Sequence, residues 1–157
     1  MKKCSAVIGV ILICLSALSG CKKTPLPDLP GDAVAFKMGT FVDHEHDDAA
    51  FGTIEYNGRM YIYYGTTNKK FRQSCVESCI GYIIQDENSS SVVDLDNTDR
   101  RIYTLSGDSG QNFLMDFDAS IKLMNQPSFF RAIDTKGTDI EIPEYIDSLG
   151  YEFWGEQ

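Results

Sequence analysis

Two histidines in an acidic segment are the residues best suited to bind a metal ion. His44 and His46 are the only histidines of the chain, and they lie in residues 43–48, DHEHDD. In extended chain, residues two apart point to the same side, so both imidazoles would face one ion. Asp47 would add a carboxylate oxygen. The pattern predicts a transition-metal site at His44, His46 and Asp47; the alternative is a solvated acidic loop that binds no metal.

Two of the five cysteines, Cys75 and Cys79, belong to the body of the chain. An exported protein can form a disulfide, but closing a CxxxC loop needs a turn that brings the two Cα atoms within about 7 Å. One cysteine pair is not a zinc motif, which usually takes four ligands. We therefore expect either a Cys75–Cys79 disulfide or two free thiols.

The amino-terminal segment has the layout of a secretory signal. Residues 1–3 are basic, and residues 4–18 are apolar or small and uncharged. This run is shorter than the roughly 20 apolar residues of a membrane-spanning helix. It ends in LSGC at residues 18–21, which resembles the lipobox of bacterial lipoproteins. The resemblance implies a diacylglycerol group on the thiol of Cys21 and cleavage before it; the alternative is an ordinary secretory signal with a chance cysteine.

These features divide the chain into three parts. Residues 1–20 are the predicted lipoprotein signal peptide, and residues 21–31 are a lipidated tether whose prolines favour extended chain. Residues 32–157 are of the size of one domain, which commonly has about 100–150 residues. We expect a single extracytoplasmic, β-rich domain there.

The charge balance limits the possible partners. The formal net charge of the whole chain is −9, and Lys2 and Lys3 leave with the predicted signal. A surface this acidic repels nucleic acid and anionic lipid headgroups, so we expect no nucleic-acid partner. It attracts a cationic peptide or a divalent cation; the alternative is that the charge serves only solubility.

The strongest local signal is a hairpin around Asn57-Gly58, which suits a type I′ turn. The flanking runs are rich in aromatic and β-branched residues, and one face is expected to carry Ile54, Tyr56, Tyr61 and Tyr63. Further short strands separated by turn residues predict an antiparallel β sandwich or small barrel with one or two short helices.

The remaining elements are assigned from local pattern. We expect short strands within 33–41, at 80–85, 101–105, 112–117 and 121–124, and a short helix or turn in 66–78 with Phe71, Cys75 and Cys79 on one stripe. Pro127 suits the first turn of a helix, and residues 143–149 a short helix closed by Gly150. The aromatic residues near the carboxyl terminus, Tyr151, Phe153 and Trp154, are expected to fold back on the core.

Five sequence words spread over the domain are similar to uncharacterised lipoproteins of Clostridia-type bacteria: IEYNG at 54–58, CIGY at 79–82, RIYTL at 101–105, FFRA at 129–132 and DSLGY at 147–151. That resemblance implies no particular activity. A second resemblance, over less than half of the chain, is to lantibiotic immunity lipoproteins, which share a lipobox, an Asn/Gly hairpin before a tyrosine-rich strand and a later pair of strands. No binding residue transfers from it.

We expect no enzymatic activity, because a histidine-based triad would have to use one of two histidines in an acidic loop. The sequence therefore predicts a lipoprotein anchored at the extracytoplasmic face of the cell membrane. Its domain is expected to be a non-catalytic module that binds a cationic peptide or an envelope protein. The alternative is a metal-binding lipoprotein that uses the loop of His44 and His46.

Overall fold

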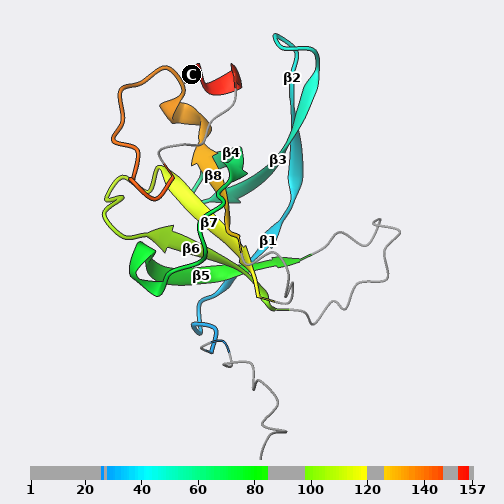
Figure 1. The fold of residues 1–157 in the computed structure, drawn as a ribbon. Coiled ribbons are helices and arrows are strands. Elements are labelled where there is room, and N and C mark those ends of the chain that lie inside the picture. The colour runs from blue at the N-terminus through cyan, green and yellow to red at the C-terminus, as the bar shows by residue number, and fades with distance from the viewer. Residues whose placement is uncertain (1–25, 27, 85–97, 120–125, 147–151, 156–157) are drawn as a thin grey trace, which may run out of the picture.

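The domain is mainly β, with no α-helix among the described residues (Figure 1). The computed structural model describes residues 26, 28–84, 98–119, 126–146 and 152–155. The strands are β1 (Val34–Lys37), β2 (Gly39–Asp43), β3 (Ala49–Tyr56), β4 (Arg59–Thr66), β5 (Val76–Ile84), β6 (Arg100–Leu105), β7 (Phe113–Asp118) and β8 (Ser128–Ala132). The predicted short helices are replaced in this part of the chain by 3-10 turns, η1 (Gln73–Cys75), η2 (Ile133–Thr135) and η3 (Glu152–Trp154).

All eight strands form one sheet in the order β1-β5-β6-β7-β8-β4-β3-β2. The pairs are antiparallel except β1 and β5, which run parallel with Val34 opposite Gly81. β1 and β2 lie at opposite edges of the sheet, yet only Met38 separates them in sequence. Because consecutive Cα atoms are about 3.8 Å apart, the two edges must come close together, and the sheet curls.

The fold is therefore a curled half-barrel, which agrees with the predicted β class and is nearer to the barrel than to the sandwich, since the described residues contain no second sheet. Local sequence patterns cannot distinguish a sandwich from a half-barrel, since both consist of short strands with alternating polar and apolar residues. β1 lies against β3 where the sheet almost closes. A cavity of about 380 Å³ remains along this seam, lined by residues 34–39 of β1 and β2 and 53–55 of β3.

The concave face of the sheet encloses the first of two apolar clusters. Phe36 of β1 and Tyr56 of β3 meet across the seam with ring centroids 5.9 Å apart. The buried residues of this cluster come from seven of the strands, and they are Phe36, Ile54, Tyr61, Ile83, Ile102, Leu114, Phe130 and Ala132.

The second cluster lies on the opposite face, under the carboxyl-terminal segment. Phe153 and Trp154 are each 4% exposed, as expected from the sequence, and Ile146 is fully buried. They cover sheet residues that include Ile62, Tyr64, Tyr103, Leu105, Phe113, Met115, Phe117 and Phe129. The central strands β4, β6, β7 and β8 are thus buried on both faces, which explains their nearly continuous apolar runs.

The predicted hairpin is confirmed as β3 and β4. Asn57 and Gly58 have φ values of 51° and 75°, the left-handed conformation that a type I′ turn requires at both central positions. Ile54 and Tyr61 are buried in the concave cluster, with Tyr56 and Tyr63 packed against it. The four side chains share one face as the alternation predicts.

Two local predictions are wrong. Residues 128–132 form the central strand β8, paired with β4 and β7, rather than the helical turn expected after Pro127. The stripe of Phe71, Cys75 and Cys79 does not lie on one helix, because η1 ends at Cys75 and Cys79 belongs to β5. Predicted strands at 101–105 and 112–117 are found as β6 and β7, while the region 33–41 divides into β1 and the first part of β2. Of the predicted helix at 143–149, residues 144–146 form a turn. Its last three residues, the predicted strand at 121–124 and Tyr151 lie outside the described residues.

Candidate functional site

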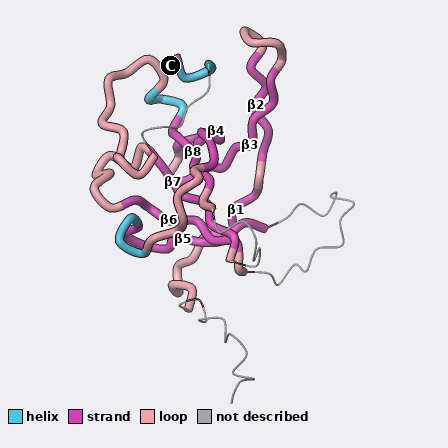
Figure 2. The backbone as a smooth tube through the Cα atoms, in the orientation of Figure 1, coloured by secondary structure: helices cyan, strands magenta, loops and turns pink. Residues whose placement is uncertain are grey.

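An acidic pocket of about 260 Å³ opens between two loops. One loop joins β6 to β7, and the other follows η2; Figure 2 shows both on the same side of the sheet. Its lining residues are Ser106, Gly107, Asp108, Ser109, Gly110, Asn112, Glu141, Pro143 and Glu144. Because small-molecule pockets usually have about 300–1,000 Å³, this one has room for a single side chain or a small polar group.

Asp108 is the buried carboxylate of the pocket. The residue is 8% exposed, and its Oδ2 accepts a hydrogen bond of 2.7 Å from the main-chain N–H of Phe113. The Asp108 carbonyl also accepts a bond of 3.0 Å from the Gln111 N–H, which closes the loop on itself. The side chain thus fixes the loop to the start of β7 and keeps a negative charge at the pocket.

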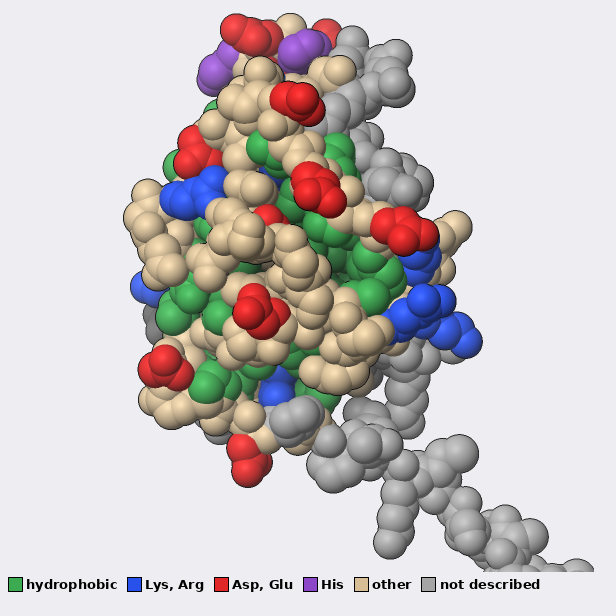
Figure 3. Space-filling view, turned by 90° about the vertical axis from the view of Figure 1, so that its left-hand side faces the viewer, with side chains coloured by type: hydrophobic (Ala, Val, Ile, Leu, Met, Phe, Trp, Pro, Cys, Tyr) green, Lys and Arg blue, Asp and Glu red, His purple; other side chains and the backbone are tan. Residues whose placement is uncertain are grey.

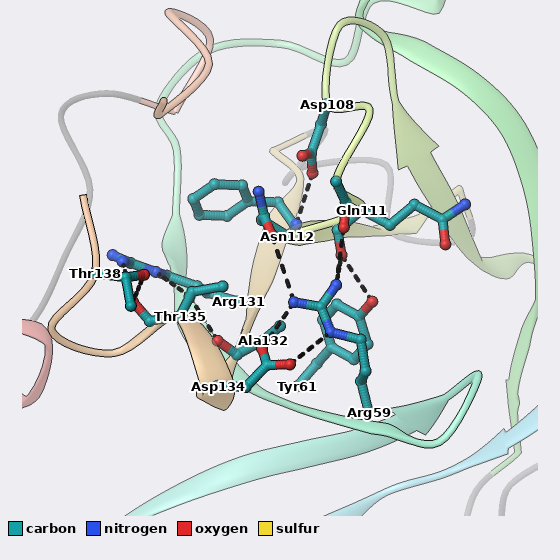
Figure 4. Close-up of polar contacts among 12 residues, drawn as sticks. Arg59, Tyr61, Asp108, Gln111, Asn112, Arg131, Ala132, Asp134, Thr135 and Thr138 are labelled. Carbon is teal, nitrogen blue, oxygen red and sulfur yellow. Dashed lines mark hydrogen bonds and ion pairs between the residues drawn. The ribbon is translucent and has the colours of Figure 1, made fainter. Parts of the chain in front are cut away.

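Arg59 holds this loop in place from the first position of β4 (Figure 4). Its Nη1 donates to the carbonyls of Gly110 and Gln111 at 2.8 and 2.9 Å. The same guanidinium binds both oxygens of Asp134 at 3.0 Å from Nε and 2.7 Å from Nη2. The Tyr61 hydroxyl donates a second bond, of 2.8 Å, to the Gln111 carbonyl. A single arginine therefore joins the hairpin, the β6–β7 loop and η2.

Glu141 and Glu144 supply the exposed carboxylates of the pocket. The main chain of their segment is fixed by Lys69, whose Nζ donates to the Glu144 carbonyl at 2.8 Å, and by the Tyr145 hydroxyl, which donates to the Lys70 carbonyl at 2.7 Å. Burial, reinforced by the nearby thiol of Cys75, raises the pKa of Tyr145 to about 12, so this donor keeps its proton at neutral pH.

The pocket belongs to an acidic face. Figure 3 looks onto the side that carries the loops, and acidic side chains are spread over it, whereas most Lys and Arg side chains lie toward its margins. Within the described residues, the carboxylates of Glu141 and Glu144 make no ion pair or hydrogen bond. They are available to a cation from outside.

The two histidines lie at the tip of the β2–β3 hairpin and do not act as a pair. His44 Nδ1 is 2.7 Å from Asp48 Oδ1, and His46 Nδ1 is 2.7 Å from Asp43 Oδ2. Figure 3 shows the two purple side chains apart at this tip. Residues 44–48 form a turn, so the alternation of extended chain does not apply to them.

The structure instead brings His46 together with Asp43 and Glu45. Asp43 is 3% exposed at the end of β2 and accepts a bond of 3.0 Å from the Glu45 N–H. Burial raises the pKa of its carboxyl, but the hydrogen bonds from Glu45 and His46 outweigh this and hold the pKa below its ordinary value. Sequence reasoning missed Asp43 and Glu45, since the extended-chain assumption put Asp47 beside the histidines.

Asp108, Glu141 and Glu144 were also missed by the sequence analysis. Residues 106–110, SGDSG, have only the composition of a turn, and more than 30 residues separate Asp108 from the two glutamates. No spacing rule connects such positions, because their proximity follows from how the loops pack beside the sheet.

Cys75 and Cys79 are not joined by a disulfide in this structure. Cys79 is opposite Tyr103, whereas the Cys75 carbonyl accepts a bond from the Ser106 N–H. Tyr103 and Ser106 are three residues apart on nearly extended chain, or roughly 10 Å at 3.3 Å per residue. The two cysteines, which lie beside these residues, are about as far apart, and this exceeds the ~7 Å Cα separation that a disulfide tolerates.

The predicted lipidation site, Cys21, lies outside the described residues, as does most of the tether at 21–31. No helix in the described part of the chain is long and apolar enough to span a membrane. In comparisons with known proteins, no family model, no curated protein and no solved structure matches this chain.

Proposed function

We propose that this protein is a lipoprotein anchored through Cys21 at the extracytoplasmic face of the membrane, whose β domain is a non-catalytic module that binds a cationic peptide or a basic envelope protein. The basic start, the short apolar run and LSGC at residues 18–21 support the anchor. Two acyl chains hold a protein on a bilayer far more firmly than one, at ~0.8 kcal/mol per buried CH₂.

The pocket of Asp108, Glu141 and Glu144 is the observation that carries the binding proposal. These three acidic residues line a space of about 260 Å³, which fits one lysine or arginine side chain better than a whole small molecule. Main-chain groups and the hydroxyls of Ser106 and Ser109 surround them and offer further acceptors for an ammonium or guanidinium group.

The net charge of the chain supports the same partner class. A uniformly acidic surface increases the rate of encounter with a cationic peptide, and salt weakens that attraction. An exposed carboxylate at the rim contributes little by itself, so several basic side chains of one ligand would have to bind together.

The anchor is tested by processing and location. In the native bacterium, globomycin is expected to cause the unprocessed precursor to accumulate, and Cys21→Ser is expected to release the protein from the membrane fraction. Unchanged processing in globomycin, or membrane retention of the Cys21→Ser variant, would contradict the anchor. Neither outcome bears on the pocket.

The binding proposal is tested with a synthetic polylysine peptide and the full-length protein in detergent, at several salt concentrations. Removing two rim carboxylates in Glu141→Gln/Glu144→Gln is expected to weaken binding roughly fivefold at low salt and to reduce the salt dependence. The matched control is Glu55→Gln/Glu77→Gln, which removes the same charge from exposed strand positions. Equal losses of affinity in the two double variants would mean that only the net charge matters, and would reject the pocket as the binding site. The absence of any salt-sensitive binding of polylysine would reject the proposal that the protein binds a cationic peptide.

A further inference from the structure

The tip of the β2–β3 hairpin holds a compact set of metal-ligating groups, separate from the acidic pocket. One ligand atom each from Asp43, Glu45 and His46 lies within 4.8 Å of the others, and this is the one such group among the described residues. We infer that Asp43, Glu45 and His46 bind a divalent transition-metal ion, for which Zn²⁺ has the best-matched chemistry. This inference does not depend on peptide binding.

The donor set decides the class of metal. One imidazole nitrogen and two carboxylates are ligands that Zn²⁺ takes at about 2.0–2.2 Å, with water completing a tetrahedral shell. A nitrogen ligand argues against Ca²⁺ and Mg²⁺, which prefer oxygen. Four carboxylates within residues 43–48 also make the tip strongly attractive to a divalent cation.

Two of the three ligands are already held in position. The buried carboxylate of Asp43 is fixed by the Glu45 N–H at 3.0 Å, and its Oδ2 is 2.7 Å from His46 Nδ1. The His46 side chain is 39% exposed, so an ion can reach it from solvent.

The third ligand has the freedom to complete the site. Ligand atoms of a tetrahedral zinc shell are about 3.3 Å apart. The three ligand atoms lie within 4.8 Å of one another, so no pair has to approach by more than roughly 1.5 Å on binding. Glu45 is exposed, and rotation of its side chain supplies this movement without moving β2. Lys136, whose charge acts on Asp43, opposes the ion, and this repulsion lowers the affinity without changing the ligand set.

His44 does not belong to the group of Asp43, Glu45 and His46. Its Nδ1 lies 2.7 Å from Asp48 Oδ1, and its side chain is 80% exposed. It therefore provides a matched control, because it is a histidine of the same hairpin tip with an aspartate partner.

The experiment is a Zn²⁺ titration of the full-length protein in detergent, without a polyhistidine tag, against a chromogenic chelator. We expect one Zn²⁺ per chain, a loss of affinity of roughly tenfold or more in His46→Ala and in Asp43→Asn, and unchanged affinity in His44→Ala. Thermal unfolding of each apoprotein, followed by the fluorescence of Trp154, establishes that the variants are folded. Should Asp43→Asn fail to fold, His46→Ala alone decides.

Three results would overturn the inference. They are the absence of saturable binding, an equal loss in His44→Ala and His46→Ala, and full retention of affinity in His46→Ala. The second would restore the histidine pair expected from the sequence. Since the polylysine assay uses a different pocket, failure of either experiment leaves the other unaffected.

Discussion

Among the described residues, Arg131 is the most completely buried charged residue, at 1% exposure. Its guanidinium carbon lies 4.6 Å from the ring centroid of Trp154. Its Nε donates to Thr135 Oγ1 at 2.9 Å and its Nη2 to the Thr135 carbonyl at 3.1 Å. A desolvated cation–π contact contributes about 2 kcal/mol or more, so Arg131 fastens the carboxyl-terminal segment to β8.

We expect Arg131→Lys to lower the free energy of unfolding by about 2 kcal/mol, because lysine keeps the charge but has no planar fork to stack and donate in parallel. Urea unfolding followed by the fluorescence of Trp154, the single tryptophan, measures this. Arg72→Lys, at an exposed position, is the control and should be within about 0.5 kcal/mol of the wild type. Equal effects of the two substitutions would contradict the role of Arg131.

Two aspartates should influence acid stability in opposite directions. The hydrogen bond from Arg59 lowers the pKa of Asp134, so folding favours its ionised form. Burial raises the pKa of Asp116 despite the bonds from Arg100, so folding favours its protonated form. Asp134 therefore contributes to the free energy of unfolding above its unfolded pKa of 3.8, and this contribution is lost as the pH falls through its lower pKa in the folded protein. Asp116 contributes below 3.8, and its contribution is lost as the pH rises through its higher pKa in the folded protein.

Asp134→Asn and Asp116→Asn are therefore expected to change the pH dependence of stability with opposite sign. A range of about pH 2 to about pH 6 covers both titrations. Over this range the free energy of unfolding of the wild type should rise relative to that of Asp134→Asn. The rise should be less than about 1 kcal/mol, because the ion pair of Asp134 with Arg59 is exposed. Relative to Asp116→Asn, this free energy should fall over the same range. Urea midpoints measured across this range test both slopes, and slopes of the same sign would contradict the two environments.

At the scale of elements, the pairing of β1 with β5 depends on a close approach at Gly81. A Cβ on this residue would lie 2.0 Å from the main-chain oxygen of Val34 and 2.8 Å from the ring of Phe36. On the other side of β5, the register against β6 shifts between Cys79 and Gly81. Only a residue without a side chain fits between the strands.

Gly81→Ala is expected to displace β1 and to cost about 2 kcal/mol or more, as overpacking of a closely fitted contact does. Gly31→Ala is the control, since a Cβ there meets nothing within 4 Å. Hydrogen exchange of the β1 and β5 amides, together with urea unfolding, reports both effects. Undisturbed protection of β1 in Gly81→Ala would contradict the close approach.

The elements that local sequence predicted correctly are those whose geometry is local. Asn57 and Gly58 accept positive φ, and the alternation on either side of them identifies the hairpin face. β8 was mistaken for a helical turn because both of its faces are buried, so Phe129, Phe130 and Ala132 show no alternation. Its partner β4 is so distant in sequence that no short-range pattern reveals the pairing.

At the scale of the whole molecule, the carboxyl-terminal aromatics cover one face of the sheet. The Phe153 ring lies 5.4 Å from Phe41 and 5.6 Å from Phe51, and Trp154 lies 5.8 Å from Tyr64, between ring centroids. The last residues of the domain thereby join the β2–β3 hairpin to the central strands. One of these contacts is made by Phe41 in β2, the strand that ends at Asp43.

We expect Phe153→Ala to lower the free energy of unfolding by about 3 kcal/mol, in the range of buried aromatic truncations, and to expose apolar surface that binds a hydrophobic dye. Val42→Ala, at a strand position that is 37% exposed, serves as the comparison and should change stability by about 0.5 kcal/mol or less. Similar losses of unfolding free energy in Phe153→Ala and Val42→Ala would mean that the carboxyl-terminal segment does not stabilise the sheet by covering it.

Short-range patterns were enough to predict a β-rich fold, its hairpin at Asn57-Gly58, several of its strands and the return of Phe153 and Trp154 to the core. These features depend on backbone dihedral preferences, on the alternation of polar and apolar residues and on composition, all of which are properties of residues close together in sequence. The curl of the sheet, the ligand set at Asp43 and the pocket at Asp108 came from packing between segments far apart along the chain. The sheet joins β1 to β5 and β4 to β8, and a linear sequence carries no distance between such strands. Which carboxylates meet is therefore settled by strand order and loop packing, not by their spacing in sequence.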